Sequence, residues 1–338
     1  MPEIKIDSRL LAGRSAVVLE RLYMEHDGKE ILMAYHEELA DSGQTVSYPS
    51  LKTMACGKDT GGHTAPSKER TVIEDRVSLN GLVPGLEYEV KGTLILKGTG
   101  KPVVINGKKV ISSAVFTADS SETEIVMEFV FDGKKLAGET AVVFEELFHN
   151  GTEIAFHEDI NDDDQSVNII GIKTFAKDRK TGRKEMVLDS SAVISDTVKY
   201  MNLIPGRTYT LKGTVISASD GCAVAQNGEF ISSEMEFVPD EPDGEVEMLF
   251  VLDTNKLQGE KLVVFEKLYA GSSSDNQNGD TEPVAVHEDI NDEGQTVYVP
   301  EVPEEVPDTD GDPHLGSTAL MMAASGAGLL WIMMRRRF

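Results

Sequence analysis

The sequence predicts an all-β fold, in which tandem antiparallel β-sandwiches of the immunoglobulin-like or prealbumin-like kind precede a C-terminal transmembrane helix. Three observations predict it: a segment pattern that repeats along the chain, short alternating apolar runs within each repeat, and an uncharged apolar run near the C-terminus. The 338 residues correspond to about two domains of ordinary size, with some chain left over.

An internal repeat defines the expected domains. The run AVVFEELF recurs as LVVFEKLY, and LKTMACGKD recurs as IKTFAKD. Equivalent residues lie 121 positions apart, as Thr53 and Thr174 do. A fixed period of this kind is typical of duplicated structural units. We therefore expect one full repeat at residues 51–170 and a second at 171–299.

A third copy at the start of the chain is incomplete. AVVLERLY and the HEE that follows repeat only the last third of the unit. A β-sandwich that lacks most of its strands cannot bury its sheets, and two-stranded pieces are marginal alone. We therefore expect residues 1–50 to be the C-terminal part of a truncated repeat, with sequence missing before residue 1.

Within each full repeat the pattern is that of β-strands. Runs such as YEVKGTLIL, EIVMEFVF and TAVVFEEL are separated by Gly, Pro, Asn and Asp turn residues. About seven such strands in a repeat, without a 3.6-residue period, favour two packed antiparallel sheets.

The composition changes after the second repeat. Glu, Asp and Pro dominate residues 300–314, which predicts an extended acidic linker. The twenty residues 315–334 carry no charge and precede Arg335, Arg336 and Arg337. A run of this length predicts a membrane span with the arginines on the cytoplasmic side, so that 315–338 form a transmembrane segment and tail. A buried core helix is the alternative.

Charge and cysteine content narrow the function. A net charge of −26 argues against a nucleic-acid partner, because phosphate would be repelled over most of the surface. The acidic bulk would lie outside the cell. The two cysteines, Cys56 and Cys222, fall in different repeats and predict no disulfide framework. The start of the chain has no apolar stretch of signal-peptide length.

Reactive side chains recur in register. Each full repeat has a Thr near its start, an Asp 22 residues later, a Glu that ends the VVFE run, and a His followed eight residues later by a Gln. A surface carboxylate, a strand end and a turn would explain any single copy. Three copies of the His-to-Gln spacing favour a shared chemical role, although duplication alone also preserves residues. The candidates are Thr53, Asp75, Glu145, His157 and Gln165; then Thr174, Asp196, Glu266, His287 and Gln295; and, in the partial repeat, Glu20, His36 and Gln44.

On these motifs the repeats resemble the T-Q ester-bond domains, or VaFE repeats, of Gram-positive surface adhesin stalks. The resemblance covers nearly all of residues 1–299 and rests on L/I-K-T, an Asp before the L-x-P-G turn, V-V-F-E and H-E-D-x-N-D-x-x-Q-[ST]. It implies that a Thr on the first strand and a Gln on the last form an intramolecular ester and release ammonia. Thr53 would pair with Gln165, and Thr174 with Gln295.

The resemblance also implies that the Asp, Glu and His of each full repeat assist the bond. A neutral imidazole can take the proton of a Thr hydroxyl. An Asp and a Glu in an apolar interior cannot both ionise cheaply, so one would stay protonated and donate a hydrogen bond to the Gln carbonyl. Such a reaction is a single turnover in cis, so we expect no enzyme activity, cofactor or metal. Gln44 has no upstream Thr and should form no ester.

The C-terminal segment resembles a sortase sorting signal. Pro307, Asp308 and Thr309 follow the family pattern, but Asp310 stands where a Gly should follow the Thr. Sortase and peptidoglycan are therefore candidate partners, and a retained membrane anchor at 315–334 is the alternative. The same DTDGD stretch lacks the later ligands of a calcium loop.

These observations favour a mechanical stalk whose repeats carry tension through their esters. Two other functions stay open. One is an adhesin module that binds a host extracellular protein, which the aromatic content of 6% argues against. A missing N-terminal region is the alternative holder of a host ligand. The other is a hydrolase that uses Thr and His on an external substrate, which the recurring Gln argues against because it supplies an internal target.

Overall fold

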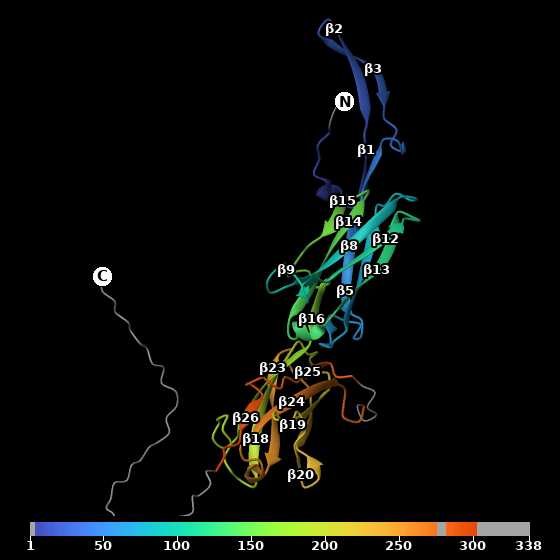
Figure 1. The fold of residues 1–338 in the computed structure, drawn as a ribbon. Helices are drawn as coiled ribbons and strands as arrows, with labels where there is room; N and C mark the ends of the chain where they lie inside the picture. Colours follow the sequence, from blue (N-terminus) through green and yellow to red (C-terminus); the bar gives the residue numbers. More distant parts are fainter. Residues whose placement is uncertain (1–3, 276–281, 303–338) are drawn as a thin grey trace, which may run out of the picture. The chain divides into compact units, whose positions relative to one another are not determined.

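The computed structural model describes residues 4–275 and 282–302 and shows an all-β protein (Figure 1). The described strands are joined by turns and by short 3₁₀-helices, η1 (Ser8–Leu11), η2 (Gly133–Leu136) and η3 (Thr254–Lys256). The predicted all-β class with antiparallel sheets is confirmed.

Two sheets build the repeat at residues 51–170. One has the strand order β13-β7-β5; the other has the order β12-β8-β14-β16-β6, with β15 paired to β14 and β9 to β8. Every pair is antiparallel except β16 with β6. The strands are β5 (Ser50–Gly57), β6 (Thr64–Ala65), β7 (Thr71–Asn80), β8 (Glu87–Leu96), β9 (Lys101–Pro102), the hairpin β10 (Val104–Ile105) and β11 (Lys108–Lys109), β12 (Ile111–Thr117), β13 (Glu122–Phe131), β14 (Thr140–His149), β15 (Thr152–His157) and β16 (Ser166–Ile169).

The repeat at residues 171–299 has the same plan. Its sheets have the orders β17-β18-β23 and β22-β19-β24-β25, with β26 paired to β24. The strands are β17 (Gly171–Asp178), β18 (Ala192–Met201), β19 (Tyr209–Ser217), the hairpin β20 (Ala225–Gln226) and β21 (Glu229–Phe230), β22 (Ser232–Phe237), β23 (Gly244–Leu252), β24 (Lys261–Ala270), β25 (Ala285–His287) and β26 (Thr296–Tyr298).

Each full repeat has its own hydrophobic core between its two sheets. In the first, Val77 and Phe129 of one sheet share a core with Val90 and Leu147 of the other. Side chains alternate across a strand, so every second residue points into this core. The equivalent core of the second repeat contains Val198, Phe250, Leu211 and Leu268.

A glycine next to a buried Glu lets the two sheets approach closely. Gly92 in β8 lies opposite Glu145 in β14. A Cβ atom at Gly92 would lie 2.5 Å from Cζ of Phe129, so the aromatic ring occupies the space that a side chain would take. The second repeat repeats this packing with Gly213 and Phe250. The ring therefore closes the core beside the carboxyl group.

Residues 4–48 contain two small antiparallel sheets of two strands each. β1 (Arg14–Val17) pairs with β4 (Thr45–Tyr48), and β2 (Glu20–His26) pairs with β3 (Lys29–His36). All residues of β2 and β3 are exposed. Among the described residues, both hydrophobic cores draw their buried members from beyond Ser50.

Several predicted features lie outside the described residues. These are most of the acidic linker at 300–314, the sorting-signal residues Pro307, Asp308 and Thr309, and the apolar run at 315–334 with its arginine tail. Across 4–275 and 282–302, no helix has the length and apolar character needed to span a bilayer.

The packing around Gly92 predicts that Gly92→Ala destabilises the first repeat by about 1–3 kcal/mol, because the added methyl group must displace Phe129. The free energy of unfolding, from urea denaturation, is the measurement. Gly62→Ala is the matched control, since a Cβ atom there meets nothing within 4 Å. Equal stability of the two variants would contradict the packing argument.

Candidate functional site

Each full repeat buries a polar cluster between its sheets. In the first repeat, Thr53 of β5 and Asp75 of β7 point inward from one sheet, because Asp75 lies opposite Ala55, two residues after Thr53. Glu145 of β14 points inward from the other sheet. The exposed fractions of Thr53, Asp75, Glu145 and Gln165 are between 0 and 3%. Four polar side chains therefore occupy positions that ordinarily hold apolar groups.

Strand pairing places the histidine. His157 in β15 lies directly opposite Glu145 in β14. The turn between these strands has Asn150 at φ 49° and Gly151 at φ 75°, and two successive left-handed residues are the signature of a tight type I′ hairpin. In the second repeat a longer connection leads to the same register, with His287 opposite Glu266.

Two backbone hydrogen bonds position the glutamine segment. The NH of Val143 in β14 donates to the backbone carbonyl oxygen of Gln165 at 3.2 Å. The NH of Ala55 in β5 donates to the backbone carbonyl oxygen of Asp164 at 2.8 Å. The segment is thus held between the strand that carries Thr53 and the strand that carries Glu145. The same pair of bonds recurs in the second repeat, from Val264 to Gln295 and from Ala176 to Gly294.

In the first repeat the predicted reactive groups touch. Gln165 Nε2 donates to Thr53 Oγ1 at 2.6 Å and also to a carboxyl oxygen of Glu145. Thr53 Oγ1 lies 3.3 Å from Glu145 Oε2 and 3.3 Å from His157 Nδ1. The side-chain carbonyl carbon of Gln165 is one bond from the contacting nitrogen, so the hydroxyl lies next to the carbon that an ester would use.

The second repeat brings the equivalent residues together with one difference. Thr174 Oγ1 lies 3.2 Å from His287 Nδ1, and Gln295 Nε2 donates to Glu266 Oε2 at 2.9 Å. The amide of Gln295 also donates to the backbone carbonyls of Val264 and His287, at 2.6 and 2.8 Å. The side-chain amide of Gln295 thus donates to backbone oxygens, whereas the side-chain amide of Gln165 donates to the hydroxyl of Thr53.

The side-chain carbonyl of Gln295 has a backbone donor. Its Oε1 accepts from the NH of Asp289 at 3.3 Å. From the sequence we expected the protonated carboxyl to face the Gln carbonyl. In both repeats the carboxyl instead faces the amide nitrogen, because a carboxyl oxygen accepts readily from an NH group. That expected contact is therefore wrong for this state of the site.

Burial controls the charge of the carboxyl pair. Burial raises the pKa of Asp75 to about 6. Burial, reinforced by the neighbouring charge of Asp75, raises the pKa of Glu145 to about 10. Between these values the pair holds one proton, and the Glu145 carboxyl can donate it to Asp75. In the second repeat burial likewise raises the pKa of Asp196 and, further, that of Glu266.

A second aspartate of the HEDIND motif holds the imidazole. His157 Nε2 lies 3.1 Å from Asp162, and His287 Nε2 lies 3.0 Å from Asp292. In the second repeat the backbone NH of Thr174 donates to His287 Nδ1 at 3.2 Å, which leaves the ring proton of a neutral imidazole on Nε2. Burial lowers the pKa of His287 and favours that neutral ring. Asp162 and Asp292 had no predicted role, although the sequence shows their fixed spacing from the His.

Lys184 distinguishes the second site from the first. Its ammonium group donates to the backbone carbonyl of Ala176 at 2.6 Å and to that of Gly294. Burial lowers the pKa of Lys184, and the charge of Lys184 offsets part of the rise that burial causes in the pKa of Asp196. The residue 121 positions earlier is His63, which bonds instead to the backbone carbonyl of Ser166.

The partial repeat retains part of the cluster. Glu20 and His36 lie opposite each other in β2 and β3, and His36 Nε2 lies 3.0 Å from Asp41. The carbonyl oxygen of Gln44 accepts from the NH of Val18 at 3.0 Å. These contacts match those of the full repeats.

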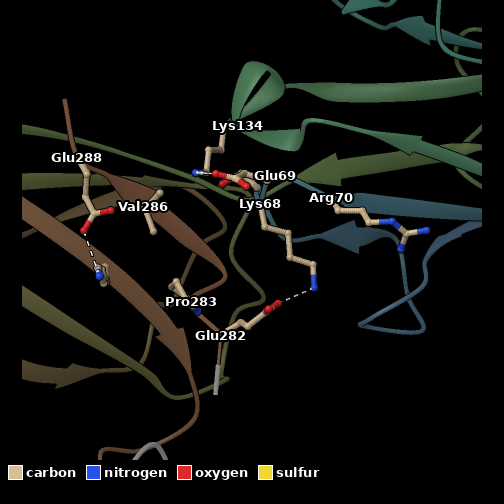
Figure 2. A pocket seen from close by; sticks show the side chains of 10 residues that line it. Lys68, Glu69, Arg70, Lys134, Glu282, Pro283, Val286 and Glu288 are labelled. Atoms are coloured by element: carbon tan, nitrogen blue, oxygen red, sulfur yellow. Dashed lines mark hydrogen bonds and ion pairs between the residues drawn. The ribbon is translucent and has the colours of Figure 1, made fainter. Parts of the chain in front are cut away.

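A surface hollow lies apart from the buried polar clusters. It has a volume of about 580 Å³ and is lined largely by charged residues (Figure 2). Lys68 lies 3.0 Å from Glu282, and Lys267 lies 3.2 Å from Glu288. None of the clustered Thr, Gln or His residues lines it. Within the described residues, no group of three or more His, Cys, Asp or Glu side chains is arranged to hold a metal ion.

The raised pKa of Glu145 predicts how stability depends on pH in a Thr53→Ala variant. The folded repeat keeps a proton that the unfolded chain releases above its ordinary pKa of 4.5, so this stabilisation is full at low pH and is lost as pH rises through about 10. The free energy of unfolding, measured in urea across this range, should fall. Adding Glu145→Gln should flatten the decline; identical slopes in the two variants would refute the assignment.

Solved structures that match this chain include a bacterial adhesin. An adhesin from Mobiluncus mulieris, described as containing intramolecular disulfide, isopeptide and ester bond cross-links, is 15% identical over 65% of this chain and 80% of its own, with a TM-score of 0.31. The C-terminal domain of the AgI/II polypeptide BspA from Streptococcus agalactiae is 7% identical over 74% and 97%, with a TM-score of 0.34. Red sea bream transglutaminase is 12% identical over 77% and 32%, with a TM-score of 0.24.

The search of curated proteins found no match. A family model described as "T-Q ester bond containing domain" matches three successive segments, residues 3–48, 49–169 and 170–299. These segments contain all three copies of the cluster described above and cover most of the chain. The chain therefore belongs to the family of T-Q ester bond containing domains.

Proposed function

We propose that this chain is a structural stalk of a bacterial surface adhesin, in which each full repeat is crosslinked by a self-formed Thr–Gln ester. The observation that carries the proposal is the contact of Thr53 Oγ1 with the Gln165 amide at 2.6 Å, in a core where burial favours a neutral carboxyl beside them. Membership of the ester-bond family supports it.

In the proposed reaction the histidine acts as the base. His157 Nδ1 faces the Thr53 hydroxyl, while Asp162 holds the opposite ring nitrogen and so favours the tautomer that can accept a proton. The hydroxyl oxygen attacks the side-chain carbonyl carbon of Gln165. Packed strands hold the two groups together, which supplies the high effective concentration that an unreactive amide requires.

Two groups are placed to stabilise the later steps. Glu145 faces the amide nitrogen, so its neutral form can protonate the departing nitrogen as ammonia leaves. In the second repeat the NH of Asp289 faces the carbonyl oxygen and can stabilise the negative charge that develops there. In place of the expected hydrogen bond from one protonated carboxyl to the Gln carbonyl, we therefore propose that Glu145 acts as a general acid.

Burial favours this internal reaction over hydrolysis of an external substrate. Thr53 is 3% exposed and Thr174 is 1% exposed, and Gln165 and Gln295 are fully buried beside their carboxyl pairs. A substrate from solution would meet almost no accessible surface of either threonine. The chemistry we propose is thus one turnover in cis, without enzymatic activity on other molecules.

The ester would join the two ends of a repeat. Thr53 lies on β5, the first strand of its repeat, and Gln165 directly precedes β16, the last. The loop closed between them spans 112 residues, for which crosslinking theory gives a stabilisation of about 5 kcal/mol. Tension that enters at one end would pass through the covalent bond and spare the sandwich between, which suits a stalk that must resist force and proteolysis.

The proposed location is the outside of a Gram-positive cell. The net charge of −26 keeps such a stalk solvated. Attachment would come through the C-terminal region, either by sortase at Thr309 and linkage to peptidoglycan or by retention of the apolar run at 315–334 in the membrane. Binding of a host ligand by the repeats themselves is the less favoured alternative.

Intact-mass measurement tests the two esters. The folded chain should lack the mass of two ammonia molecules, Thr53→Ala should lack that of one, and the double variant with Thr174→Ala should have its full unmodified mass. Thr117→Ala, at an exposed position, is the control and should keep both losses. An unmodified mass for the mature wild-type protein would sink the proposal.

The histidine–aspartate pair should control the rate of ester formation. His157→Ala should slow the reaction in the first repeat by a factor of about 100 to 10,000, which is the usual contribution of a positioned base. Asp162→Asn should slow it less, because the ring remains but loses its charged partner. The crosslinked fraction is followed by mass against time after cell-free synthesis.

Asp163→Asn is the matched control for this pair, since the Asp163 side chain is 99% exposed. It should react at the wild-type rate. The second repeat of each variant provides an internal reference. If Asp162→Asn and Asp163→Asn behave alike, Asp162 has no role in holding the histidine.

A further inference from the structure

The second full repeat carries an ammonium group at its candidate site. Lys184 lies half-buried between the strand that bears Thr174 and the segment that bears Gln295. Its Nζ atom donates to the backbone carbonyl of Ala176 at 2.6 Å and also to that of Gly294. Ala176 lies two residues after Thr174, and Gly294 directly precedes Gln295. The ammonium group therefore bridges the two chain segments that an ester would join.

Backbone pairing fixes the position of this lysine. The carbonyl oxygen of Lys184 accepts from the NH of Tyr298 in β26 at 2.8 Å. In the first repeat the carbonyl oxygen of His63 accepts from the NH of Asn168 in β16 at 2.9 Å, so the two residues occupy equivalent places in the fold. The side chain of His63 is exposed, and its ring contacts the backbone carbonyl of Ser166. The ammonium group thus distinguishes the second full repeat from the first.

Carboxyl groups face the ammonium group of Lys184. Burial lowers its pKa, and the negative charges that oppose this fall are those of Asp196, Asp292 and Glu293. Two of these carboxyls have a second cationic partner. Asp292 lies 3.0 Å from His287 Nε2. Glu293 lies 3.0 Å from Lys261 Nζ. Asp196 instead belongs to the buried pair with Glu266, so its charge is the one that Lys184 balances inside the core.

This balance affects the protonation of the carboxyl pair. Burial raises the pKa of Asp196, and the charge of Lys184 offsets part of the rise. Burial and the charge of Asp196 raise the pKa of Glu266 well above its usual range. Asp196 therefore ionises at a lower pH than it would without the lysine, while Glu266 keeps its proton.

The positive charge matters most when the pair gives up that proton. In the proposed reaction the hydroxyl proton of Thr174 passes to His287 as Oγ1 attacks Cδ of Gln295. The Cδ–Nε2 bond breaks, and the proton of Glu266 passes to the departing nitrogen, which leaves as ammonia. Glu266 and an ionised Asp196 then both carry negative charge until His287 returns a proton to Glu266. Two such charges in an apolar core are unfavourable, and a nearby cation lowers their energy.

We propose that Lys184 is a positioning residue of the second ester site. Its ammonium group holds the strand of Thr174 against the segment of Gln295, and it balances the negative charge that builds on the carboxyl pair as Glu266 donates its proton. The inference rests on the proposed ester chemistry. It assigns to the second repeat a means of crosslinking while its aspartate is ionised.

The test follows ester formation in the full chain as a function of pH. The chain is recovered unfolded in urea and diluted into buffers from about pH 5 to about pH 8, between the ordinary pKa values of carboxyl and ammonium groups. Peptide mapping against time gives the rate of the link between Thr174 and Gln295. The link between Thr53 and Gln165 in the same molecules is the internal reference.

Lys184→Met should slow the second link about 10-fold at the upper end of this range, because the doubly charged pair loses its cation. The ratio of wild-type to variant rates should shrink towards the lower end, where Asp196 takes up a proton and needs no countercharge. Taking the ratio removes the protonation of His287, which both proteins share and which also depends on Asp289 and Lys173. Lys184→Arg keeps the charge and should restore most of the rate.

Two further variants complete the test. Lys177→Met is the matched control, since Lys177 lies on the exposed face of β17, and it should leave both rates unchanged. His63→Lys places an ammonium group at the equivalent position of the first repeat. It should speed the link between Thr53 and Gln165 about 3-fold or more at the upper end of the pH range. This arm decides the question if the Lys184→Met repeat fails to fold.

The possible failures are distinct. An equal slowing by Lys184→Met at every pH would overturn the proposal, because loss of a structural contact alone does not depend on the charge of Asp196. An unchanged rate in that variant, or no acceleration by His63→Lys, would overturn it as well. In each case the proposed function stands if the wild-type chain forms both links. If the wild-type chain forms neither link, both proposals fall.

Discussion

The chemistry of the candidate site depends on two carboxyl groups that lie together in the core of each full repeat. Asp75 and Glu145 come from opposite sheets and are both fully buried. Two negative charges cannot occupy an apolar core at close range, so the pair keeps a proton that an exposed carboxyl would lose. This retained proton makes the pair compatible with folding, and it also provides an acid beside an amide.

The sandwich architecture positions the other reactive groups around this carboxyl pair. Opposite-strand pairing sets His157 beside Glu145, and the backbone bond from Ala55 to Asp164 ties the threonine strand to the glutamine segment. A glycine opposite the glutamate admits an aromatic ring that closes the core at this point. Because these features recur in the second repeat, the arrangement belongs to the fold and not to one set of loops. The matching contacts in the partial repeat, where Glu20 lies opposite His36 and Asp41 holds His36, show further that the glutamine side is organised locally.

Much of the fold and of the candidate site could be predicted from the sequence, because the duplication shows which residues occupy equivalent positions. The offset between Thr53 and Thr174 identified the clustered residues, and strand periodicity predicted the all-β fold. The orientation of the Gln295 amide, its contact with the Asp289 backbone NH, and the approach of Lys184 could not be predicted, because they depend on how loops meet strands in three dimensions. The HEDIND motif did contain Asp162 at fixed spacing, but only the folded loop shows that it reaches His157.

The central claim is a covalent bond between two named side chains, and peptide mapping of the mature protein tests it most directly. After proteolysis, the account predicts one linked species that contains both Thr53 and Gln165, lacks one ammonia, and separates into its two peptides when the ester is hydrolysed with base. A second linked species should contain Thr174 and Gln295. Recovery of these four residues in separate peptides of unmodified mass would contradict the account.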